Sequence, residues 1–298
     1  IRDAQESRGL GDVYKRQAPA GQPVAGRALP ARLKLSLAGY SFRRELDTPG
    51  KPGAMSLLDL ADLCARLDLD AVEPTSYYFL RTDDEWLYRL KSHIFRLGLE
   101  ISGTPINTNF ALPPGQERDA QLAHCRTWVD IALKLGSPTI RVFAGRPPQA
   151  GTREEMFPLV VEGLARSCEY AGSRGIFLAI ENHGYLTETA DDLLRIVEAV
   201  GSPWLGVNLD SGNFHEAPYE NFARVAPHAI VCQVKAEVRL GGDRREPTDY
   251  RRIVAILRDA GYRGYLALEY EGADPAVRVP IEIRRLQEAV RTAEREPA

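Results

Sequence analysis

The chain lacks any apolar run that approaches the roughly 20 residues of a membrane-spanning helix. It also lacks an excess of either charge, because 38 lysines and arginines stand against 41 aspartates and glutamates. The resulting net charge of −3 gives no electrostatic reason to expect an anionic surface as a partner. We therefore expect neither a membrane nor nucleic acid as a partner.

Cysteine is also scarce, and its spacing excludes a recognisable zinc or redox motif. The four cysteines are widely separated and form no CxxC pair: Cys64, Cys125, Cys168 and Cys232. They fall on helical or strand patterns, so we expect buried, reduced thiols. Reduced thiols favour a cytoplasmic location, with export left open.

The first 30 residues lack apolar periodicity and are rich in Gly, Ala, Pro, Gln and Arg. This composition predicts a disordered extension, which is either an assembly artefact or the remnant of a leader. The folded domain is expected to span residues 31–298.

Short apolar strand patterns alternate with amphipathic helical patterns along the rest of the chain. The predicted strands are 33–42, 70–76, 99–107, 139–145, 176–183, 204–213, 229–238 and 264–271. The predicted helices are 56–67, 83–97, 117–135, 153–174, 189–200, 219–226, 248–260 and 276–294. No glycine-rich phosphate loop marks an open nucleotide-binding sheet. Eight strand–helix cycles therefore predict a single-domain α/β protein, a closed (β/α)8 barrel of the TIM type.

The four last predicted strands each have one aliphatic face and one face of small or polar residues. Side chains alternate with a period of two in a strand, and the aliphatic face must pack on the helices. The polar face therefore points into the barrel. Its polar members come late in each strand, at the end where enzymes of this fold keep their sites.

Glu181, Asp210, Gln233 and Glu269 hold corresponding late, inward positions on these four strands. Neighbouring strands lie about 4.8 Å apart, so the four side chains can converge. Three converging carboxylates raise one another's pKa unless a cation lies between them. All the donor atoms are oxygens, so this arrangement predicts a divalent metal, Mn²⁺ or Mg²⁺. The alternative is ordinary hydrogen bonding at the barrel mouth.

Other inward positions are candidates for contact with a substrate. His183 is expected to contact substrate or carry a proton, unless it is only a hydrogen-bonded mouth histidine. Lys235 is expected to stabilise an oxyanion, or else to form an ion pair with Glu237 or Glu269. Further inward candidates for substrate binding are Tyr40, Glu73 and Arg141. Arg239, after the seventh strand, meets either an anionic substrate group or solvent.

Four segments resemble the sugar phosphate isomerase/epimerase family, the xylose isomerase-like barrels. They are AIENHGYLTET around Glu181, GVNLDSGN around Asp210, CQVKAE around Gln233 and LALEYEG around Glu269. The resemblance implies metal ligation by all four residues, with Glu181 and Glu269 also moving protons. Gln233 departs from the family pattern, since many members have histidine there, and a neutral amide oxygen binds a metal more weakly.

The resemblance and the site together predict a metal-dependent isomerase or epimerase of a keto-sugar, acting through an enediolate. Its catalytic residues are expected to be Glu181, Glu269, His183 and Lys235. The alternative is a metal-dependent lyase or dehydratase that acts by β-elimination on a 3-keto-glycoside or a related cyclic substrate. A carbohydrate-binding protein without catalysis and an apurinic endonuclease are further alternatives, although an endonuclease of this fold needs more histidines at the mouth. The expected partner is a small carbohydrate, and a homo-oligomer is left open.

Overall fold

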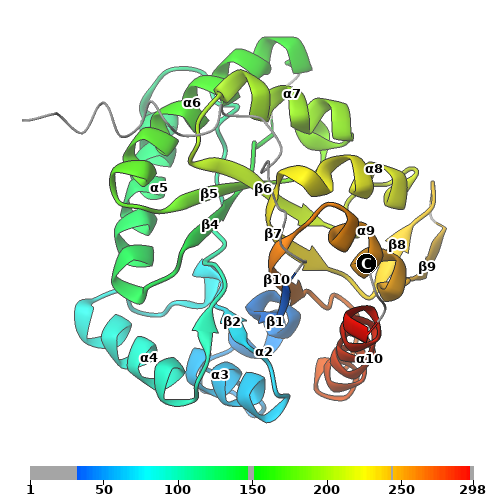
Figure 1. Cartoon of the computed structure of the whole chain (residues 1–298). Helices are drawn as coiled ribbons and strands as arrows, with labels where there is room; N and C mark the ends of the chain where they lie inside the picture. Colours follow the sequence, from blue (N-terminus) through cyan, green and yellow to red (C-terminus); the bar gives the residue numbers. More distant parts are fainter. Residues whose placement is uncertain (1–31, 147–150, 243, 296–298) are drawn as a thin grey trace, which may run out of the picture.

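The computed structural model describes residues 32–146, 151–242 and 244–295. Eight parallel strands form one curled sheet in the order β3-β2-β1-β10-β7-β6-β5-β4 (Figure 1). They are β1 (Arg32–Ala38), β2 (Ala71–Glu73), β3 (Glu100–Ile101), β4 (Thr139–Val142), β5 (Phe177–Glu181), β6 (Leu205–Asp210), β7 (Ala229–Val234) and β10 (Arg263–Leu268). The expected disorder of residues 1–30 lies outside the described residues.

The segment after β3 closes the sheet against β4. The amide of Thr104 donates to the carbonyl of Thr139 at 3.1 Å, and the amide of Ile106 donates to the carbonyl of Arg141 at 3.0 Å. These bonds join the two edges of the sheet, so it has no open edge here. The predicted TIM barrel is therefore confirmed.

Helices surround the sheet and alternate with its strands (Figure 1). The longer ones are α3 (Leu57–Arg66), α4 (Asp84–Arg96), α5 (Gln116–Leu135), α6 (Arg153–Ser173), α7 (Ala190–Val200), α8 (Pro218–Val225), α9 (Tyr250–Asp259) and α10 (Pro275–Arg295). Short turns are η1 (Gly39–Phe42), α2 (Arg43–Leu46), η2 (Ser76–Tyr78), η3 (Tyr185–Thr187) and η4 (Ala226–His228).

Local sequence signals explain where several helices begin and end. Ser56 caps α3 through a reciprocal pair with Asp59, and the side chain of Asp83 caps α4. Gly136 follows α5 with a φ of 81°, a left-handed conformation that glycine adopts without strain. The predicted helix boundaries agree with the observed ones to within two residues.

The strands end earlier than the sequence predicts. The predicted strand 229–238 ends at Val234, and an antiparallel hairpin of β8 (Glu237–Arg239) and β9 (Arg245–Pro247) follows it. The hairpin is tied to the barrel by Thr248, whose hydroxyl donates to the carbonyl of Lys235 at 2.6 Å. Likewise β5 ends at Glu181, because the chain turns and the amide of His183 donates to the Glu181 carbonyl at 2.9 Å.

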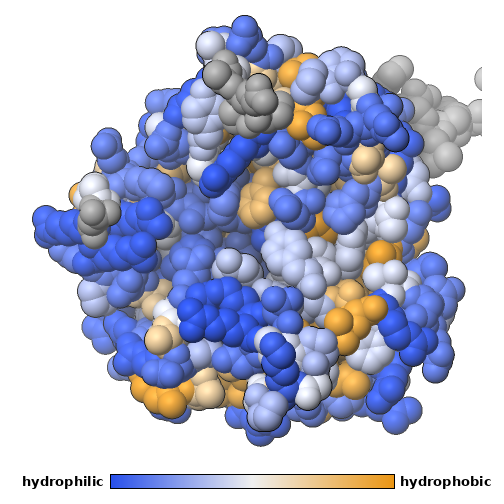
Figure 2. All heavy atoms as spheres, turned by 180° about the vertical axis from the view of Figure 1, so that it is seen from behind, coloured by the Kyte–Doolittle hydropathy of each residue, from blue (hydrophilic) through white to orange (hydrophobic). Residues whose placement is uncertain are grey.

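The outer face of the sheet is aliphatic and packs on the helices, whereas polar side chains fill the barrel interior. Ser36 on β1 and Ser102 just after β3, for example, share a buried hydrogen bond of 2.7 Å. All four cysteines are buried and free, as predicted. The face of the molecule that Figure 2 shows is mainly hydrophilic, with apolar residues in small separate groups. Within the described ranges, no helix has the length and apolarity needed to cross a membrane.

Candidate active site

Four adjacent strands bring the predicted site residues to one end of the barrel. Asp210 is directly opposite Gln233 in the pairing of β6 with β7. Glu181 ends β5 opposite Asn208 of β6. Glu269 follows β10, and its amide donates to the carbonyl of Val234 at 2.9 Å. All four predicted side chains are buried, as their inward parity requires.

Lys235 forms the centre of the carboxylate cluster, which consists of Glu181, Asp210, Glu269 and Glu271 together with the side chains that pair with them. Its Nζ lies 2.7 Å from Glu269 Oε1, 2.8 Å from Glu271 Oε1 and 3.2 Å from Asp210 Oδ2. Burial alone would lower the pKa of Lys235, but these carboxylates raise it well above its ordinary value. The predicted ion pair between Lys235 and Glu269 is therefore present. Glu237, the other predicted partner, lies on β8 and does not contact Lys235 in an ion pair.

Asp210 is the most deeply buried of the three predicted carboxylate ligands. Its Oδ1 accepts a hydrogen bond of 2.8 Å from the amide of Gly212, while Oδ2 has no hydrogen-bond partner. Burial raises the pKa of Asp210 well above its usual range, Lys235 opposes this shift, and Glu269 and Glu181 add to it. Glu269 and Glu181 thus act on Asp210 in the direction expected of neighbouring carboxylates, and the ammonium group of Lys235 acts against them.

Glu181 is held by a separate set of partners. Its Oε1 accepts a hydrogen bond of 2.8 Å from Asn213 Nδ2, a residue to which sequence reasoning assigned no role. Its Oε2 lies 2.9 Å from Arg141 Nε, in an ion pair whose N–H is not aligned for a hydrogen bond. Arg141 also donates to the carbonyl of Ile106 at 3.0 Å, and its guanidinium carbon lies 4.0 Å from the ring centroid of Phe143. Arg141 thus contacts a catalytic candidate directly.

Gln233 and Glu73 form a hydrogen-bonded pair inside the barrel. Gln233 Nε2 donates to Glu73 Oε1 at 2.8 Å, and Gln233 Oε1 accepts from Asn208 Nδ2 at 2.6 Å. Glu73 is 1% exposed, and burial together with the charge of Glu269 raises its pKa to about 8. Glu73 therefore contacts the predicted ligand Gln233, and contact with a substrate remains a prediction.

The remaining candidates lie at the mouth. His183 is exposed, and its ring centroid is 4.4 Å from that of Phe143. Its backbone amide donates to the hydroxyl of Thr187 at 2.8 Å, which fixes the loop that carries the ring. Tyr40 is half-buried in η1 beyond the end of β1, with the Arg43 guanidinium carbon 5.3 Å from its ring centroid. Their predicted substrate contacts stay predictions.

The donor set fits a hard divalent cation in its chemistry. Glu181 Oε2 and Asp210 Oδ2 are buried oxygens that accept no aligned hydrogen bond, and their ion-pair partners are Arg141 and Lys235. Buried carboxylate oxygens of this kind are suitable ligands for Mn²⁺ or Mg²⁺. Within the part of the chain that the structure describes, no three His, Cys, Asp or Glu side chains are spaced as a metal cage. Lys235 and Arg141 form ion pairs with the three predicted carboxylate ligands.

The sequence matches the family described as "Xylose isomerase-like TIM barrel" over residues 61–292. The chain therefore belongs to this family. A Mus musculus protein named "Putative hydroxypyruvate isomerase" is 27% identical over 166 residues, which are 47% of this chain and 56% of that protein. The chain thus matches little more than half the length of this curated relative.

Two solved structures illustrate the range of chemistry on similar folds. The 3-keto-D-glucoside 4-epimerase from E. coli has a TM-score of 0.69 at 13% identity, covering 86% of this chain and 100% of its own. The "probable 3-DHS dehydratase" from Bacillus anthracis has a TM-score of 0.66 at 18% identity, covering 85% and 98%. At these identities the likeness concerns the fold alone.

Proposed function

We propose that this chain is an isomerase or epimerase that moves a proton on the carbon beside the carbonyl of a keto-sugar. The observation that carries the proposal is the pair of buried glutamates, Glu181 and Glu269, at the ends of β5 and β10. Each has its own partners: Arg141 and Asn213 for the first, Lys235 for the second. Two carboxylates fixed by different contacts are suited to taking a proton and returning it.

The proposed cofactor is Mn²⁺ or Mg²⁺, held by Glu181, Asp210, Gln233 and Glu269. When bound, such an ion supplies a Lewis acid that polarises the substrate carbonyl and acidifies the neighbouring C–H bond. The set of oxygen donors supports this assignment, together with the two buried carboxylate oxygens that accept no aligned hydrogen bond.

In the proposed mechanism, one of the two glutamates removes the proton and an enediolate forms. The ammonium of Lys235, 2.7 Å from Glu269, stabilises the negative charge that develops on the substrate oxygen. Return of the proton to the opposite face of the same carbon gives an epimer, and return to the adjacent carbon gives an isomer. Arg141 positions Glu181, and Glu73 positions Gln233.

The mouth residues are proposed to hold the sugar. The exposed ring of His183, packed on Phe143, is placed to hydrogen-bond a hydroxyl or carry a proton. Tyr40 in η1 borders the same opening. These contacts would orient the substrate so that the reacting carbon lies between the two glutamates.

A lyase or dehydratase is the second candidate, because two groups that can protonate a leaving oxygen accompany the carboxylates. Lys235 lies within the cluster and His183 at its mouth. After proton removal, either group could assist loss of a β-hydroxyl or a glycosidic oxygen. The dehydratase similarity in fold is compatible with this chemistry.

The test is a proton-exchange assay in deuterated water with Mn²⁺ and a panel of hydroxypyruvate, D-fructose and a 3-keto-glucoside. NMR of each product shows where deuterium enters. Deuterium beside the carbonyl without a new double bond supports the isomerase or epimerase. A new double bond moves the assignment to the lyase, and absence of exchange with every substrate contradicts the proposal for this panel.

A further inference from the structure

A pocket of about 210 Å³ adjoins the carboxylate cluster, between the β8–β9 hairpin and the first half of α10. Five cationic side chains line it, against three carboxylates. Figure 1 shows the hairpin on the same side of the barrel as α9 and α10. The cavity has room for roughly seven waters at about 30 Å³ each, which is enough for a carboxylate or phosphate group.

On the α10 side, one carboxylate serves two arginines. Glu282 is 1% exposed and lies 3.1 Å from Arg278 Nη2 and 2.7 Å from Arg285 Nη1. It also accepts a hydrogen bond of 3.0 Å from the hydroxyl of Tyr250. The pair of guanidinium groups therefore keeps a net positive charge after Glu282 is counted.

On the hairpin side, two arginines face each other without an anion between them. Arg239 of β8 is directly opposite Arg245 of β9 in the antiparallel register, so their side chains leave the same face of the hairpin. Arg239 is half-buried and has no ion pair with any described residue, whereas Arg245 reaches only Glu237, at 3.9 Å. Like charges in directly opposed positions destabilise a hairpin, and a bound anion would remove that cost.

The positive charge of this pair acts on the loop after β6. His215, in the loop after β6, has a pKa below its ordinary value because it is partly buried and because Arg239 and Arg245 oppose its protonation. An anionic group of a ligand at the mouth would be attracted by the same charge.

The pocket shares lining residues with the carboxylate cluster. Lys235, Asn213 and Glu271 line it and also belong to the carboxylate cluster. Lys235 lies 2.7 Å from Glu269, and Asn213 donates a hydrogen bond to Glu181. The pocket is therefore one residue contact away from each glutamate, through Asn213 to Glu181 and through Lys235 to Glu269.

We propose that Arg239 and Arg245, with the excess charge of Arg278 and Arg285, bind an anionic group of the substrate. The substrate is then an acidic keto compound, a keto-sugar acid or a ketose phosphate, and not a neutral sugar. This assignment rests on the proposed function for the reacting end of the substrate, but the anion pocket itself is defined by the arginines.

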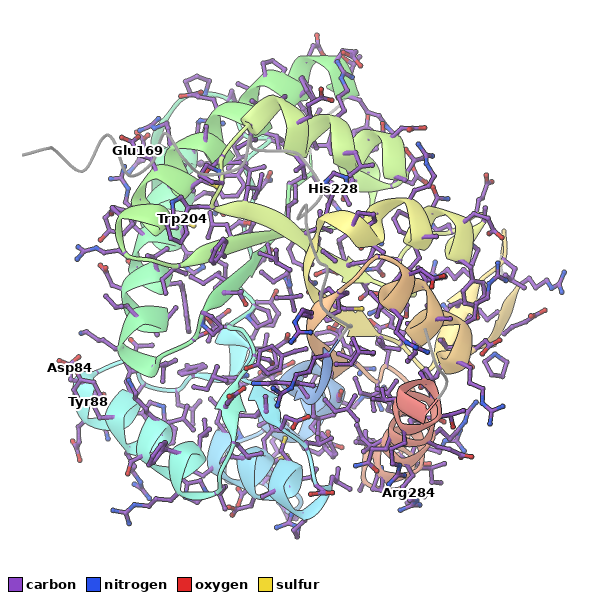
Figure 3. All side chains as sticks on the ribbon, viewed as in Figure 1. Asp84, Tyr88, Glu169, Trp204, His228 and Arg284 are labelled. Carbon is purple, nitrogen blue, oxygen red and sulfur yellow. The ribbon has the colours of Figure 1, made fainter. Side chains whose placement is uncertain are left out.

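The direct test is calorimetric titration of the metal-free protein with inorganic phosphate, D-glycerate and the neutral control glycerol. We expect phosphate or D-glycerate to bind and glycerol not to. Arg239→Gln and Arg245→Gln should each weaken anion binding about tenfold or more, because each removes a charged hydrogen-bond donor. Arg284→Gln, on the outer face of α10, should leave binding unchanged (Figure 3). The anion that binds more tightly, phosphate or D-glycerate, indicates whether the substrate carries a phosphate or a carboxylate.

Equal anion affinity in all four proteins, or no anion binding in the parent, overturns the pocket. The binding assay does not depend on turnover, so it is separable from the proposed function. Anion binding through Arg239 and Arg245 without deuterium exchange in any substrate would leave the pocket standing and remove the isomerase assignment. Deuterium exchange into hydroxypyruvate or fructose 6-phosphate with the same KM in the parent, in Arg239→Gln and in Arg245→Gln would support the isomerase assignment. It would at the same time overturn the anion pocket.

Discussion

The side-chain amide of Gln233 on β7 donates a hydrogen bond of 2.8 Å to Glu73 on β2, although β1 and β10 separate these strands in the sheet. The bond crosses the barrel interior and fixes which way the amide is turned. Its oxygen then faces Asn208, at 2.6 Å. Both the nitrogen and the oxygen of the Gln233 amide are therefore fixed by hydrogen bonds. Glu73 and Asn208 determine in which direction the amide oxygen can bind a further group.

Glu73 gives the protein a pH-dependent stability of definite sign. Its pKa in the folded chain is about 8, against an ordinary 4.5, so the folded state keeps a proton that the unfolded state loses. The contribution of Glu73 to stability should therefore fall as pH rises from about 4.5 to about 8, by at most about 1.4 kcal/mol per pH unit. Urea unfolding in EDTA at pH 5 and pH 8 measures this slope.

Glu73→Gln keeps an acceptor for Gln233 and removes the ionisable group, so its unfolding free energy should depend less on pH and exceed the parent's at pH 8. Glu288→Gln, at an exposed position of α10, is the matched control and should keep the parent's slope. Equal slopes in the parent and Glu73→Gln would show that the carboxyl does not bind a proton over this range.

Lys235 is predicted to act as an internal counter-ion. Lys235→Met leaves Asp210 and Glu269 without their ammonium partner, which should cost about 3–5 kcal/mol of stability in EDTA. Mn²⁺ should restore more stability to this variant than it adds to the parent, because a divalent cation can compensate the same carboxylates. Thermal unfolding with and without Mn²⁺ measures both effects.

Lys51→Met, at an exposed lysine, is the control for the Lys235 experiment and should leave the unfolding temperature unchanged. If Lys235→Met is as stable as the parent in EDTA and responds to Mn²⁺ in the same way, the carboxylates do not need the ammonium group.

Gly212 is predicted to leave the space that the aliphatic part of the Lys235 side chain occupies. A Cβ at this position would lie 2.5 Å from Lys235 Cδ and 3.1 Å from its Cβ. Gly212→Ala should therefore destabilise the protein by about 1–3 kcal/mol, through overpacking and displacement of the ammonium. In a Lys235→Ala background the same change should cost much less, since Cγ and Cδ are gone. A double-mutant cycle by urea unfolding measures the coupling, and additive losses would contradict the contact.

The placement of Glu181, Asp210, Gln233 and Glu269 as buried side chains at one end of the barrel follows from the sequence, because strand parity and strand ends are local properties. The same reasoning places Glu73 and Arg141 in the barrel interior, where both are buried. Local pattern therefore accounts for the fold and for which face each of these side chains occupies.

The contacts that each side chain makes with residues of other strands could not be predicted in the same way. The sequence offers Lys235 either Glu237 or Glu269 as an ion-pair partner. Which one it meets depends on the strand ending at Val234, after which the chain turns into a hairpin. A register shift at Ile230 between β6 and β7 likewise has no local signal. The facing of Arg239 and Arg245 appears only once the hairpin is formed, because antiparallel register sets it.

The central claim is that Glu181 and Glu269 move the substrate proton. The most direct measurement is the rate of deuterium entry beside the carbonyl in the parent, in Glu181→Gln and in Glu269→Gln, with Glu188→Gln as a control outside the cluster. We predict that each of the first two variants, folded by circular dichroism, loses at least about 10²-fold in exchange rate, while Glu188→Gln does not. Exchange at the parent's rate in both glutamine variants would contradict the assignment.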